Sequence, residues 1–459
     1  MPRAALPLVV GAAQRFLSWI EHRPAPALLL IILMAAVMGI VQLSSHPPDF
    51  NFNWENRWWQ IAVNVARGEG YVACKTIYFP FCSAANHVTA MREPLPVLLF
   101  ALIARSTTES LLAAAAACVI VNLGTVLAVF FLTRELSNTR TGVLAALLWA
   151  CYLAPMLLFY SQPSGDLPAA LAITCGLFHF VRARRADRTS DWLAAGLWLG
   201  LAILCRSAAL VIVLVLVMGQ LLWPDAGAAR PSTARRLRMV AVLALVSAVI
   251  VLPWLVRTYV ALGRPLIGSS LSGYYLYRQS HMLPTENYLR FVSGGEFVSV
   301  LHDMIARRPD LRGTENEAEM DRVYREEALR IIGAEPARYL TLSAYRFLIL
   351  WFNWGVKEVY RQRNTARDYV IMVQHALLLA GGILGLRARG RRAWPLAASV
   401  FAFCLLYMAV MAHMTYVAAI VPLLVALSAM ACTDVGNQVR RGLTRVLAVS
   451  HTRAPAPGA

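Results

Sequence analysis

Long apolar runs alternate with short polar segments over most of the chain. A membrane-spanning helix needs about 20 mostly apolar residues, so this pattern predicts an all-α, polytopic membrane protein. An amphipathic stretch at 8–20 is expected on the inner membrane surface, before a first span at 25–43. Further spans are predicted at 110–132, 139–160, 166–182, 190–205, 207–223, 238–258, 368–386, 392–413 and 415–432.

Two apolar runs do not fit a simple crossing. Residues 94–105 begin with Pro94-Leu95-Pro96 and end too soon for a spanning helix, so we expect a re-entrant or interfacial helix there. Residues 339–354 are expected to be partly inserted, with both ends on the outer side. Together with the spans, these runs predict about 10–12 transmembrane or re-entrant helices.

The arginines support this topology, because cytoplasmic loops of membrane proteins are enriched in Arg and Lys. Three clusters lie inside if residues 94–105 do not cross, and outside if they do. The clusters are Arg134/Arg140, Arg182/Arg184/Arg185/Arg188 and Arg230/Arg235/Arg236/Arg238. We therefore prefer the first alternative, which puts the polar residues around Asp166, Arg206 and Arg257 on the outer face.

The same topology divides the chain into five parts. Residues 1–23 are a cytoplasmic amphipathic segment, and residues 24–258 are a transmembrane module that includes an outer loop at 44–93. The remaining parts are an outer region at 259–338, C-terminal transmembrane helices at 339–433 and a basic cytoplasmic tail at 434–459.

One helix of the outer region is well signalled. Thr314 and Glu317 have the spacing of a capping box, in which two side chains satisfy backbone N–H groups at a helix start. Apolar residues then recur at helical spacing until Gly333 and Pro336 end the pattern. We expect this helix to lie against the membrane or the helical body.

Composition narrows the class of protein. The chain has 459 residues, 58% of them hydrophobic, and a mean hydropathy of +0.56, which excludes a soluble protein of this length. Most of the net charge of +18 comes from arginines in short loops, so we interpret it as a topology signal and expect no nucleic-acid partner. The first apolar run is long enough to remain as an anchor, and no cleavable signal peptide is expected.

The polar loop after the first span contains candidate residues for chemistry. Asp49 and Glu55 are its only acids before Glu69, and they lie among aromatic residues that include Trp54 and Trp58. A carboxylate beside a low-dielectric aromatic surface is suited to act as a general base. The alternative is a solvated loop whose tryptophans belong to the interfacial aromatic belt.

Two cysteines of this loop are expected to form a disulfide. Cys74 and Cys82 lie in a short polar segment in an oxidising compartment, whereas the other cysteines lie in apolar runs or at their ends. Two cysteines alone are a poor metal site. We therefore interpret the pair as a structural clip and expect no metal site.

Charged residues near the outer ends of spans form a second group of candidates. Asp166 either complements a helix N-terminus or has a functional role. Arg206, Arg257 and Arg346 are costly at membrane depth, so each either contacts a phosphate or extends to lipid headgroups. His413 lies in the last outer loop, where an interfacial histidine is a simpler interpretation than a ligand.

Several stretches, taken in order, resemble one family. Residues 54–62 and 67–71 resemble the first outer loop of the GT-C glycosyltransferases, which include the protein O-mannosyltransferases and the aminoarabinose transferases of lipid A. Arg92-Glu93-Pro94-Leu95-Pro96 is similar to their Pro-Pro-Leu-type element, and residues 196–206 are similar to their Gly-Leu-Ala-x-Leu-Thr-Arg segment. Residues 252–259, Leu-Pro-Trp-Leu-Val-Arg-Thr-Tyr, resemble the family's Pro-Trp-x-x-Arg-Asn-Tyr element.

The chain departs from the family pattern in its loops. The family's base is usually Asp, whereas Glu55 aligns here and Asp49 is offset. Thr258 stands where Asn is usual, and Thr415-Tyr416 stands where the last loop often reads Arg-Tyr. The resemblance then assigns the donor-phosphate contact to Arg206, Arg257 or Arg346.

The resemblance implies an inverting glycosyltransferase that takes a sugar from a polyprenyl-phosphate lipid and needs no other cofactor. The acceptor would be a glycan, lipid or protein on the outer face of a bacterial inner membrane. The implied base is among Glu55, Asp49 and Asp166. The implied phosphate site is among Arg57, Arg92, Arg206, Arg257 and Arg346. The implied substrate-lining residues are Trp54, Trp58, Tyr71, Tyr274, His413 and Tyr416.

Two other functions stay open beside the enzyme. One is a transporter of lipids or lipid-linked sugars, and the other is a catalytically inactive assembly subunit that keeps the GT-C scaffold. A transporter is expected to have inverted repeats and broken spans with polar residues at the midplane, and neither is visible in the sequence. The missing arginine in the last outer loop favours the inactive subunit, but the clustering of polar groups outside favours the enzyme.

Overall fold

The computed structural model describes residues 23–48, 57–82, 87–160, 164–186, 188–222, 232–280, 294–353 and 365–452. Within these ranges the chain is helical, apart from loops and one isolated β-bridge between Val72 and Val88. The all-α membrane fold expected from the apolar pattern is confirmed. The predicted amphipathic stretch at 8–20 lies outside the described residues.

The helices of the bundle follow most of the predicted spans. The first half contains α2 (Pro24–Ser45), α4 (Pro94–Ser106), α5 (Leu111–Leu136), α6 (Thr139–Ala150), α7 (Asp166–Ala186), α8 (Thr189–Cys205), α9 (Leu210–Leu222) and α10 (Thr233–Leu262). The second half contains α14 (Pro336–Phe352), α16 (Ala366–Arg389), α17 (Trp394–Val410) and α18 (Val421–Thr452). In the described part of the chain, four more helices lie outside the bundle: α3 (Arg57–Ala66), α11 (Ser272–Ser280), α12 (Gly294–Ala306) and α13 (Glu317–Ala334).

Among the described residues, four helices are long and apolar enough to cross a membrane: α2, α5, α10 and α16. Shorter apolar helices accompany them, including α4, α8 and α17. The 13 residues of α4 extend about 20 Å at 1.5 Å per residue, which is less than the roughly 30 Å of a hydrocarbon core. As a straight helix, α4 is therefore too short to span, in keeping with the expectation for residues 94–105.

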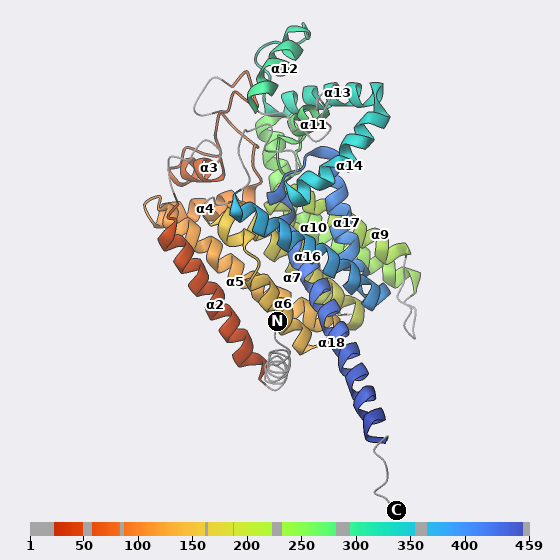
Figure 1. The fold of residues 1–459 in the computed structure, drawn as a ribbon. Coiled ribbons are helices and arrows are strands. Elements are labelled where there is room, and N and C mark those ends of the chain that lie inside the picture. The colour runs from red at the N-terminus through yellow and green to blue at the C-terminus, as the bar shows by residue number, and fades with distance from the viewer. Residues whose placement is uncertain are drawn as a thin grey trace, which may run out of the picture.

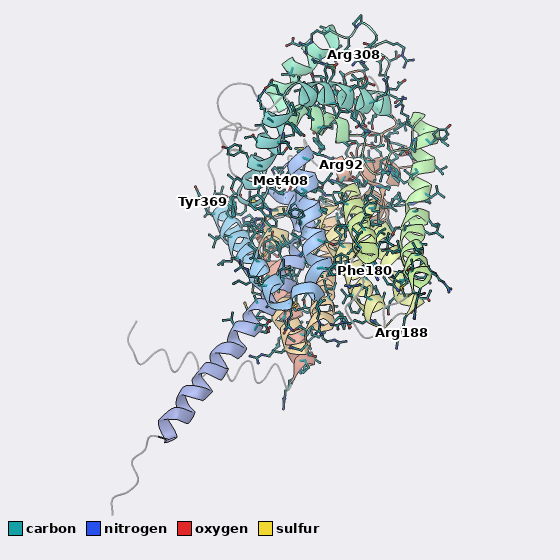
Figure 2. All side chains as sticks on the ribbon, turned by 90° about the vertical axis from the view of Figure 1, so that its right-hand side faces the viewer. Arg92, Phe180, Arg188, Arg308, Tyr369 and Met408 are labelled. Atoms are coloured by element: carbon teal, nitrogen blue, oxygen red, sulfur yellow. A yellow bond between two sulfur atoms is a disulfide. The ribbon has the colours of Figure 1, made fainter. Side chains whose placement is uncertain are left out.

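The bundle has two different ends (Figure 1). Helices α11, α12 and α13 gather beyond one end, which we call the cap end, and α18 projects beyond the other. Helix α13 packs on α11, and α3 packs on α4. Figure 2 shows Arg188, from a predicted inner loop, far from Arg308, from the predicted outer region, as the predicted topology requires.

Glycines allow the closest helix contacts. A Cβ at Gly196 of α8 would lie 2.8 Å from the Cβ of Val246, and one at Gly200 would lie 2.8 Å from the Cβ of Ile250, both on α10. The two glycines form a small-xxx-small pair, a pattern by which membrane helices approach closely. This contact between α8 and α10 fixes the position of α8 and therefore of Arg206 at its end.

The predicted span at 139–160 is wrong in one respect, because it is not a single helix. Helix α6 ends at Ala150, and a π-helix (Pro155–Phe159) follows a short non-helical segment. A proline has no N–H to donate and its ring clashes with the preceding turn, so Pro155 disfavours continuation of α6, although α10 does continue through Pro253.

Side chains of α16 satisfy the backbone of this break. Gln374 donates to the carbonyl of Cys151 at 2.8 Å and accepts from the N–H of Leu153 at 3.1 Å. The hydroxyl of Tyr152 lies 2.7 Å from Nε2 of His375. The break is therefore a fixed contact between α6 and α16, with its polar groups paired.

The helix of the outer region begins two residues later than the sequence indicates. Asn316, and not Thr314, is the N-cap of α13: its side chain accepts from the N–H of Glu319 at 3.0 Å, and the Glu319 carboxylate accepts from the N–H of Asn316 at 2.9 Å. Thr314 and Glu317 have the same spacing as this pair, so spacing alone does not separate the two registers. Glu317 is thereby left for the contacts described below.

Candidate functional site

A cavity of about 410 Å³ lies among helix ends, next to the start of α11. Its wall comes from the start of α4, the start of α7, the junction of α8 and α9, and the end of α17 with a 3-10 helix at Met414–Ala419. The polar lining residues are Arg92, Glu93, Ser164, Asp166, Arg206, Ser207, Ser269, Ser272, Tyr275, Tyr407, Thr415 and Tyr416. Figure 2 places Arg92 and Met408 near the level where the bundle meets the cap helices.

The rest of the wall is apolar. It contains Trp58, Leu158, Phe159, Ala208, Leu210, Val211, Ile267, Leu406, Val410 and Met411. Ligand sites commonly combine an apolar wall with a few polar groups that fix orientation. This cavity therefore suits a ligand that has both an apolar and a charged part.

An ion pair between Arg206 and Asp166 forms one side of the cavity. Arg206 Nε donates to Oδ1 of Asp166 at 2.8 Å, and its Nη2 contacts the same oxygen. Ser164 donates to Oδ2 of Asp166 at 3.0 Å. The side chains of Arg206 and Asp166 are 14% and 5% exposed, so water screens their attraction only weakly. The guanidinium also lies 4.7 Å from the ring centroid of Tyr416, a cation–π contact.

Local backbone features place these two charges. Asp166 is the first residue of α7, where the helix dipole favours a carboxylate. Arg206 is extended and separates α8 from a 3-10 turn, Ser207–Ala209, that leads into α9. Gly165 permits the close approach, since a Cβ there would overlap the carbonyl oxygen of Cys205 and lie 2.9 Å from the ring of Trp58.

Arg92 provides the second guanidinium of the cavity. It lies 5.5 Å from the ring centroid of Trp58 and makes a long hydrogen bond, 3.4 Å, to the carbonyl of Met91. Its Nε is buried and has no hydrogen-bond partner among the described residues. A buried donor without a partner carries a desolvation penalty, which a bound anion would remove.

Glu93 is a cavity residue that sequence reasoning missed as a site candidate. Its Oε1 accepts hydrogen bonds from the N–H of Ser207 at 3.2 Å and from the Ser207 hydroxyl at 3.1 Å. Glu93 is 5% exposed and occupies the N-cap position of α4, where its side chain makes no capping hydrogen bond. The signal was its place beside Arg92 in the motif that precedes α4, but only the arginine was selected there.

The backbone behind Arg92 and Glu93 is held in place. The hydroxyl of Tyr71 donates to the carbonyl of Arg92 at 2.8 Å. Ser269 donates to the carbonyl of Met91 at 2.7 Å. Tyr71 therefore supports the cavity from outside its wall, although the sequence predicted it as a lining residue.

The structure brings part of the predicted site together. The predicted residues that line the cavity are Trp58, Arg92, Asp166, Arg206 and Tyr416. The predicted residues that the structure describes outside its wall are Tyr71, Tyr274, Arg257, Arg346 and His413. Asp49, Trp54 and Glu55 lie outside the described residues, as does the side chain of Arg57.

Arg257 donates to backbone carbonyls and lies outside the cavity wall. Its Nη1 donates to the carbonyl of Thr89 at 2.6 Å, and its Nη2 donates to the carbonyl of Tyr71 at 3.2 Å. The guanidinium lies 4.9 Å from the ring centroid of Tyr71 and 5.0 Å from that of Trp254. Arg257 thus fastens the outer loop to α10.

Arg346 is also committed to backbone groups. Its side chain is fully buried and donates to the carbonyls of Met408 at 2.9 Å, Ala409 at 3.1 Å and Gln279 at 2.8 Å. It therefore joins α14 to the end of α17 and to α11. These contacts leave it away from the cavity wall.

The two remaining predicted residues pack beside the cavity. Tyr274 lies in an aromatic cluster, with ring centroids 4.8 Å from Tyr78 and 5.6 Å from Tyr324. His413 Nδ1 lies 2.8 Å from the hydroxyl of Thr415, which does line the cavity. Neither Tyr274 nor His413 is part of the cavity wall.

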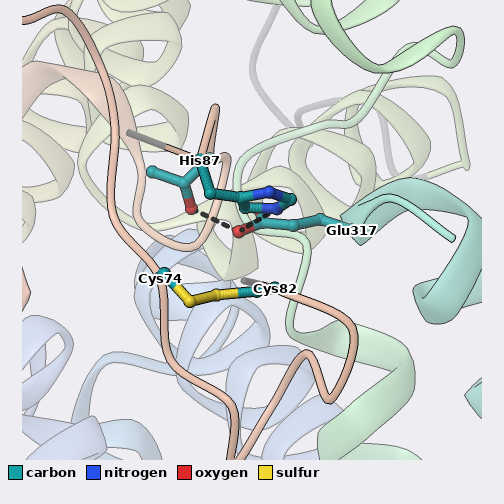
Figure 3. The surroundings of a disulfide bond; sticks show 5 residues. Cys74, Cys82, His87 and Glu317 are labelled. Atoms are coloured by element: carbon teal, nitrogen blue, oxygen red, sulfur yellow. Dashed lines mark hydrogen bonds and ion pairs between the residues drawn. A yellow bond between two sulfur atoms is a disulfide. The ribbon is translucent and has the colours of Figure 1, made fainter. Parts of the chain in front are cut away.

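A buried carboxylate, Glu317 of α13, holds the loop around Thr89 and Ala90 to α13 (Figure 3). Its Oε1 accepts from the hydroxyl of Thr89 at 2.6 Å, and its Oε2 accepts from the N–H of Ala90 at 2.7 Å and the hydroxyl of Ser270 at 2.6 Å. His87 Nε2 lies 3.9 Å from Oε1. Burial raises the pKa of Glu317 to about 7, although these hydrogen bonds and Arg257 oppose the shift.

The same loop contains the disulfide expected from the sequence. Cys74 and Cys82 are linked, with their Cα atoms 5.6 Å apart, close to His87 and Glu317 (Figure 3). Within the described ranges, no group of three or more His, Cys, Asp or Glu side chains is arranged to hold a metal ion.

The fold and this cavity define a multi-pass membrane protein with the GT-C fold. The chain is similar to the oligosaccharyltransferase of Archaeoglobus fulgidus tethered with an acceptor peptide, with a TM-score of 0.54, 15% identity, and coverage of 94% of this chain and 51% of that one. The apo form of that protein gives a TM-score of 0.51 at 15% identity, with coverage of 92% and 52%. The chain thus spans about half the length of these solved structures.

A family model described as dolichyl-phosphate-mannose-protein mannosyltransferase matches residues 92–256. This range includes Arg92, Glu93, Asp166 and Arg206. ArnT from Cupriavidus metallidurans bound to undecaprenyl phosphate matches with a TM-score of 0.39 and 14% identity, over 87% of this chain and 77% of that one, a likeness too slight to carry an argument. No curated protein sequence matches the chain.

Proposed function

We propose that the chain is a membrane glycosyltransferase that moves a sugar from a polyprenyl-phosphate donor to an acceptor on the outer face of a bacterial inner membrane. The observation that carries this proposal is the cavity, in which two guanidinium groups and two carboxylates meet beside an apolar wall. A sugar-bearing lipid phosphate has matching parts, namely an apolar chain, an anion and hydroxyl groups. The mannosyltransferase match over residues 92–256 supports the same function.

Arg92 and Arg206 are the proposed ligands of the donor phosphate. Guanidinium groups bind phosphate oxygens through paired N–H donors and stay charged at any physiological pH. When the sugar leaves, the phosphate gains negative charge, and donors that are already fixed in place stabilise that charge. The pair would take over the role of the arginine that is absent at Thr415.

The acceptor must lose a proton as it attacks. Its oxygen or nitrogen forms a bond to the anomeric carbon, the bond from that carbon to the phosphate oxygen breaks, and a carboxylate takes the proton. A single displacement of this kind inverts the anomeric carbon. Glu55, or in its place Asp49, is the proposed base. Asp166 already holds Arg206, so we assign it the role of positioning that guanidinium.

A transporter of lipid-linked sugars is the second candidate, because the break after α6 is a broken span of the kind that transporters use. The polar groups at this break are occupied, however. Gln374 bonds the backbone of the break, and His375 contacts Tyr152. None of these three side chains lines the cavity, so the enzyme is the preferred function.

The test of donor binding uses the full chain in lipid nanodiscs. We expect a polyprenyl-phosphate sugar among the copurified lipids by native mass spectrometry, and binding of added undecaprenyl phosphate. Arg92→Ala is expected to weaken that binding at least tenfold, about 1.4 kcal/mol. Arg67→Ala is the matched control, because Arg67 is a half-exposed arginine of the same outer loop that pairs with Glu109 at 2.6 Å. Copurification of bulk phospholipids alone, with no binding of undecaprenyl phosphate, would show the proposal to be wrong.

The test of chemistry measures sugar transfer from a labelled polyprenyl-phosphate donor in membranes. We expect Glu55→Gln to abolish transfer while leaving donor binding intact. Full transfer by both Glu55→Gln and Asp49→Asn would refute the assignment of the base. Donor binding by the wild type without transfer to glycan, lipid or protein would identify the inactive subunit.

A further inference from the structure

We infer that Glu93 recognises the donor sugar, by accepting a hydrogen bond from one of its hydroxyl or amino groups and so setting which sugar the cavity accepts. This inference rests on the proposed function. It is argued from the charges of the cavity, from the two oxygens of the Glu93 carboxylate and from the position of Glu93 next to Arg92.

The charges of the cavity are divided unevenly. Arg206 and Asp166 neutralise each other through the ion pair described above. Arg92 and Glu93 are neighbours in sequence, but their side chains point to different partners: Arg92 lies against Trp58 and Glu93 reaches Ser207. Among the described residues, Glu93 forms no ion pair with an arginine, lysine or histidine. Glu93 therefore has no described cation within ion-pair distance, although its charge acts on Arg92 and Arg206 from farther away.

The two carboxylate oxygens of Glu93 differ in their hydrogen-bond partners. Oε1 accepts both hydrogen bonds from Ser207. Oε2 makes no hydrogen bond with any residue of the described ranges. Glu93 is 5% exposed as a residue and lines the cavity. Its Oε2 is therefore the carboxylate oxygen that Ser207 leaves available to a hydrogen-bond donor of a ligand in the cavity.

The charge and position of Glu93 suit contact with the sugar of the donor and not with its phosphate. A carboxylate repels a phosphate and accepts hydrogen bonds only, whereas a sugar presents several donors. Arg92 and Glu93 are adjacent, as the phosphate and the sugar are in the donor lipid. The Arg92 guanidinium therefore meets the anion while the Glu93 carboxylate meets the group joined to it.

The carboxylate is held firmly enough to discriminate. Ser207 bonds it from one side, at the start of the turn that leads into α9. The Tyr71 hydroxyl holds the backbone before it, through the Arg92 carbonyl. A fixed hydrogen-bond acceptor discriminates strongly against a ligand that lacks the matching donor. An apolar pocket discriminates much less against a ligand that lacks one methylene group.

The experiment measures binding of four probes by the full chain in nanodiscs: undecaprenyl phosphate, and the same lipid phosphate carrying glucose, mannose or aminoarabinose. The wild type is expected to bind at least one sugar-bearing lipid tenfold or more tightly than undecaprenyl phosphate. In Glu93→Gln, that preference is expected to fall at least fivefold while the affinity for undecaprenyl phosphate stays within twofold. Glu109→Gln is the matched control, because Glu109 is a carboxylate of the outer face that lies away from the cavity.

Each outcome decides between roles of Glu93. An unchanged sugar preference in Glu93→Gln overturns the inference, and so does an equal loss of affinity for all four probes, which would indicate a structural role. Unchanged binding with abolished transfer would make Glu93 the general base and also overturn it. A wild type that binds undecaprenyl phosphate without preferring any sugar refutes the inference alone. A wild type that binds none of the four refutes the proposed function as well.

Discussion

Arg206 and Asp166 form a buried ion pair that joins the end of α8 to the start of α7, with Nε and Oδ1 2.8 Å apart. Each residue alone has an alternative explanation in the sequence, as a headgroup contact or as a helix-dipole partner. Neither explanation is sufficient by itself, because Arg206 and Asp166 are each other's main charged partner. Its effect on stability follows from its burial.

Asp166→Ala is expected to destabilise the fold by about 3 kcal/mol, because it leaves the Arg206 guanidinium buried without a counter-charge. The double variant Asp166→Ala/Arg206→Ala is expected to recover part of this loss, since both charges are then removed. Denaturant unfolding in detergent, analysed as a double-mutant cycle, measures the coupling. Additive losses from the two single changes would mean that the side chains do not interact.

Arg257→Ala is expected to lower thermal stability and to leave the affinity of the folded protein for undecaprenyl phosphate unchanged. The reason is that Arg257 donates to the carbonyls of Thr89 and Tyr71 and lies outside the cavity wall. Arg92→Ala is the contrast, with a large loss of affinity and a smaller loss of stability. A tenfold loss of lipid affinity in Arg257→Ala would restore it as a phosphate ligand.

Glu317 is expected to make stability depend on pH. Burial raises its pKa from an ordinary 4.5 to about 7, so between these values the folded state binds a proton that the unfolded state releases. The contribution of Glu317 to the free energy of unfolding is therefore greatest below about pH 4.5. It decreases as the pH rises and becomes constant above about pH 7. At about 1.4 kcal/mol per pKa unit, the change is roughly 3 kcal/mol.

Glu317→Gln is the variant that isolates this effect, because glutamine does not titrate. Between pH 5 and pH 8, the midpoint temperature of thermal unfolding is expected to fall less steeply in the variant than in the wild type. His87 acts in the opposite direction, since burial lowers its pKa and makes low pH unfavourable. The comparison is therefore made in a His87→Gln background, where equal slopes with and without Glu317 would contradict the assignment.

Gly165→Ala is expected to cost about 1–3 kcal/mol by overpacking and to weaken lipid binding. Its Cβ would overlap the Cys205 carbonyl and meet the Trp58 ring, so Asp166 and Arg206 would have to separate. Gly333→Ala is the matched control, because no atom lies within 4 Å of its added Cβ. That change in α13 is expected to be neutral or to stabilise by up to about 1 kcal/mol. Equal effects of the two substitutions would contradict this account.

The bundle could be predicted from the sequence because each spanning helix is set by its own apolar run. The predicted run at 368–386 falls within α16, and the run at 110–132 begins one residue before α5, since lipid imposes the same requirement on every crossing segment. The break after α6 could not be predicted in this way. It depends on Gln374, which satisfies the backbone of Cys151 and Leu153 from a helix more than two hundred residues later in the chain.

The candidate site was only partly predictable for a similar reason. Arginines at membrane depth stand out in a sequence, but their partners do not, so Arg206 could not be told apart from Arg257 and Arg346. The first meets a carboxylate in the cavity, and the others meet backbone carbonyls. Glu93 stands beside Arg92 in the family-like motif, but the sequence does not show its contact with Ser207. The contacts of Glu317 are hidden for another reason, because its spacing from Thr314 already explains it as part of a capping box.

The charges of the cavity stand at helix ends, and this links the site to the lipid around it. A membrane helix adapts to a thinner or thicker bilayer by changing its tilt, and a change in the tilt of α8 relative to α7 would change the separation of Asp166 from Arg206. On the proposed function, we therefore expect the affinity for lipid phosphate to vary with the acyl-chain length of the surrounding bilayer.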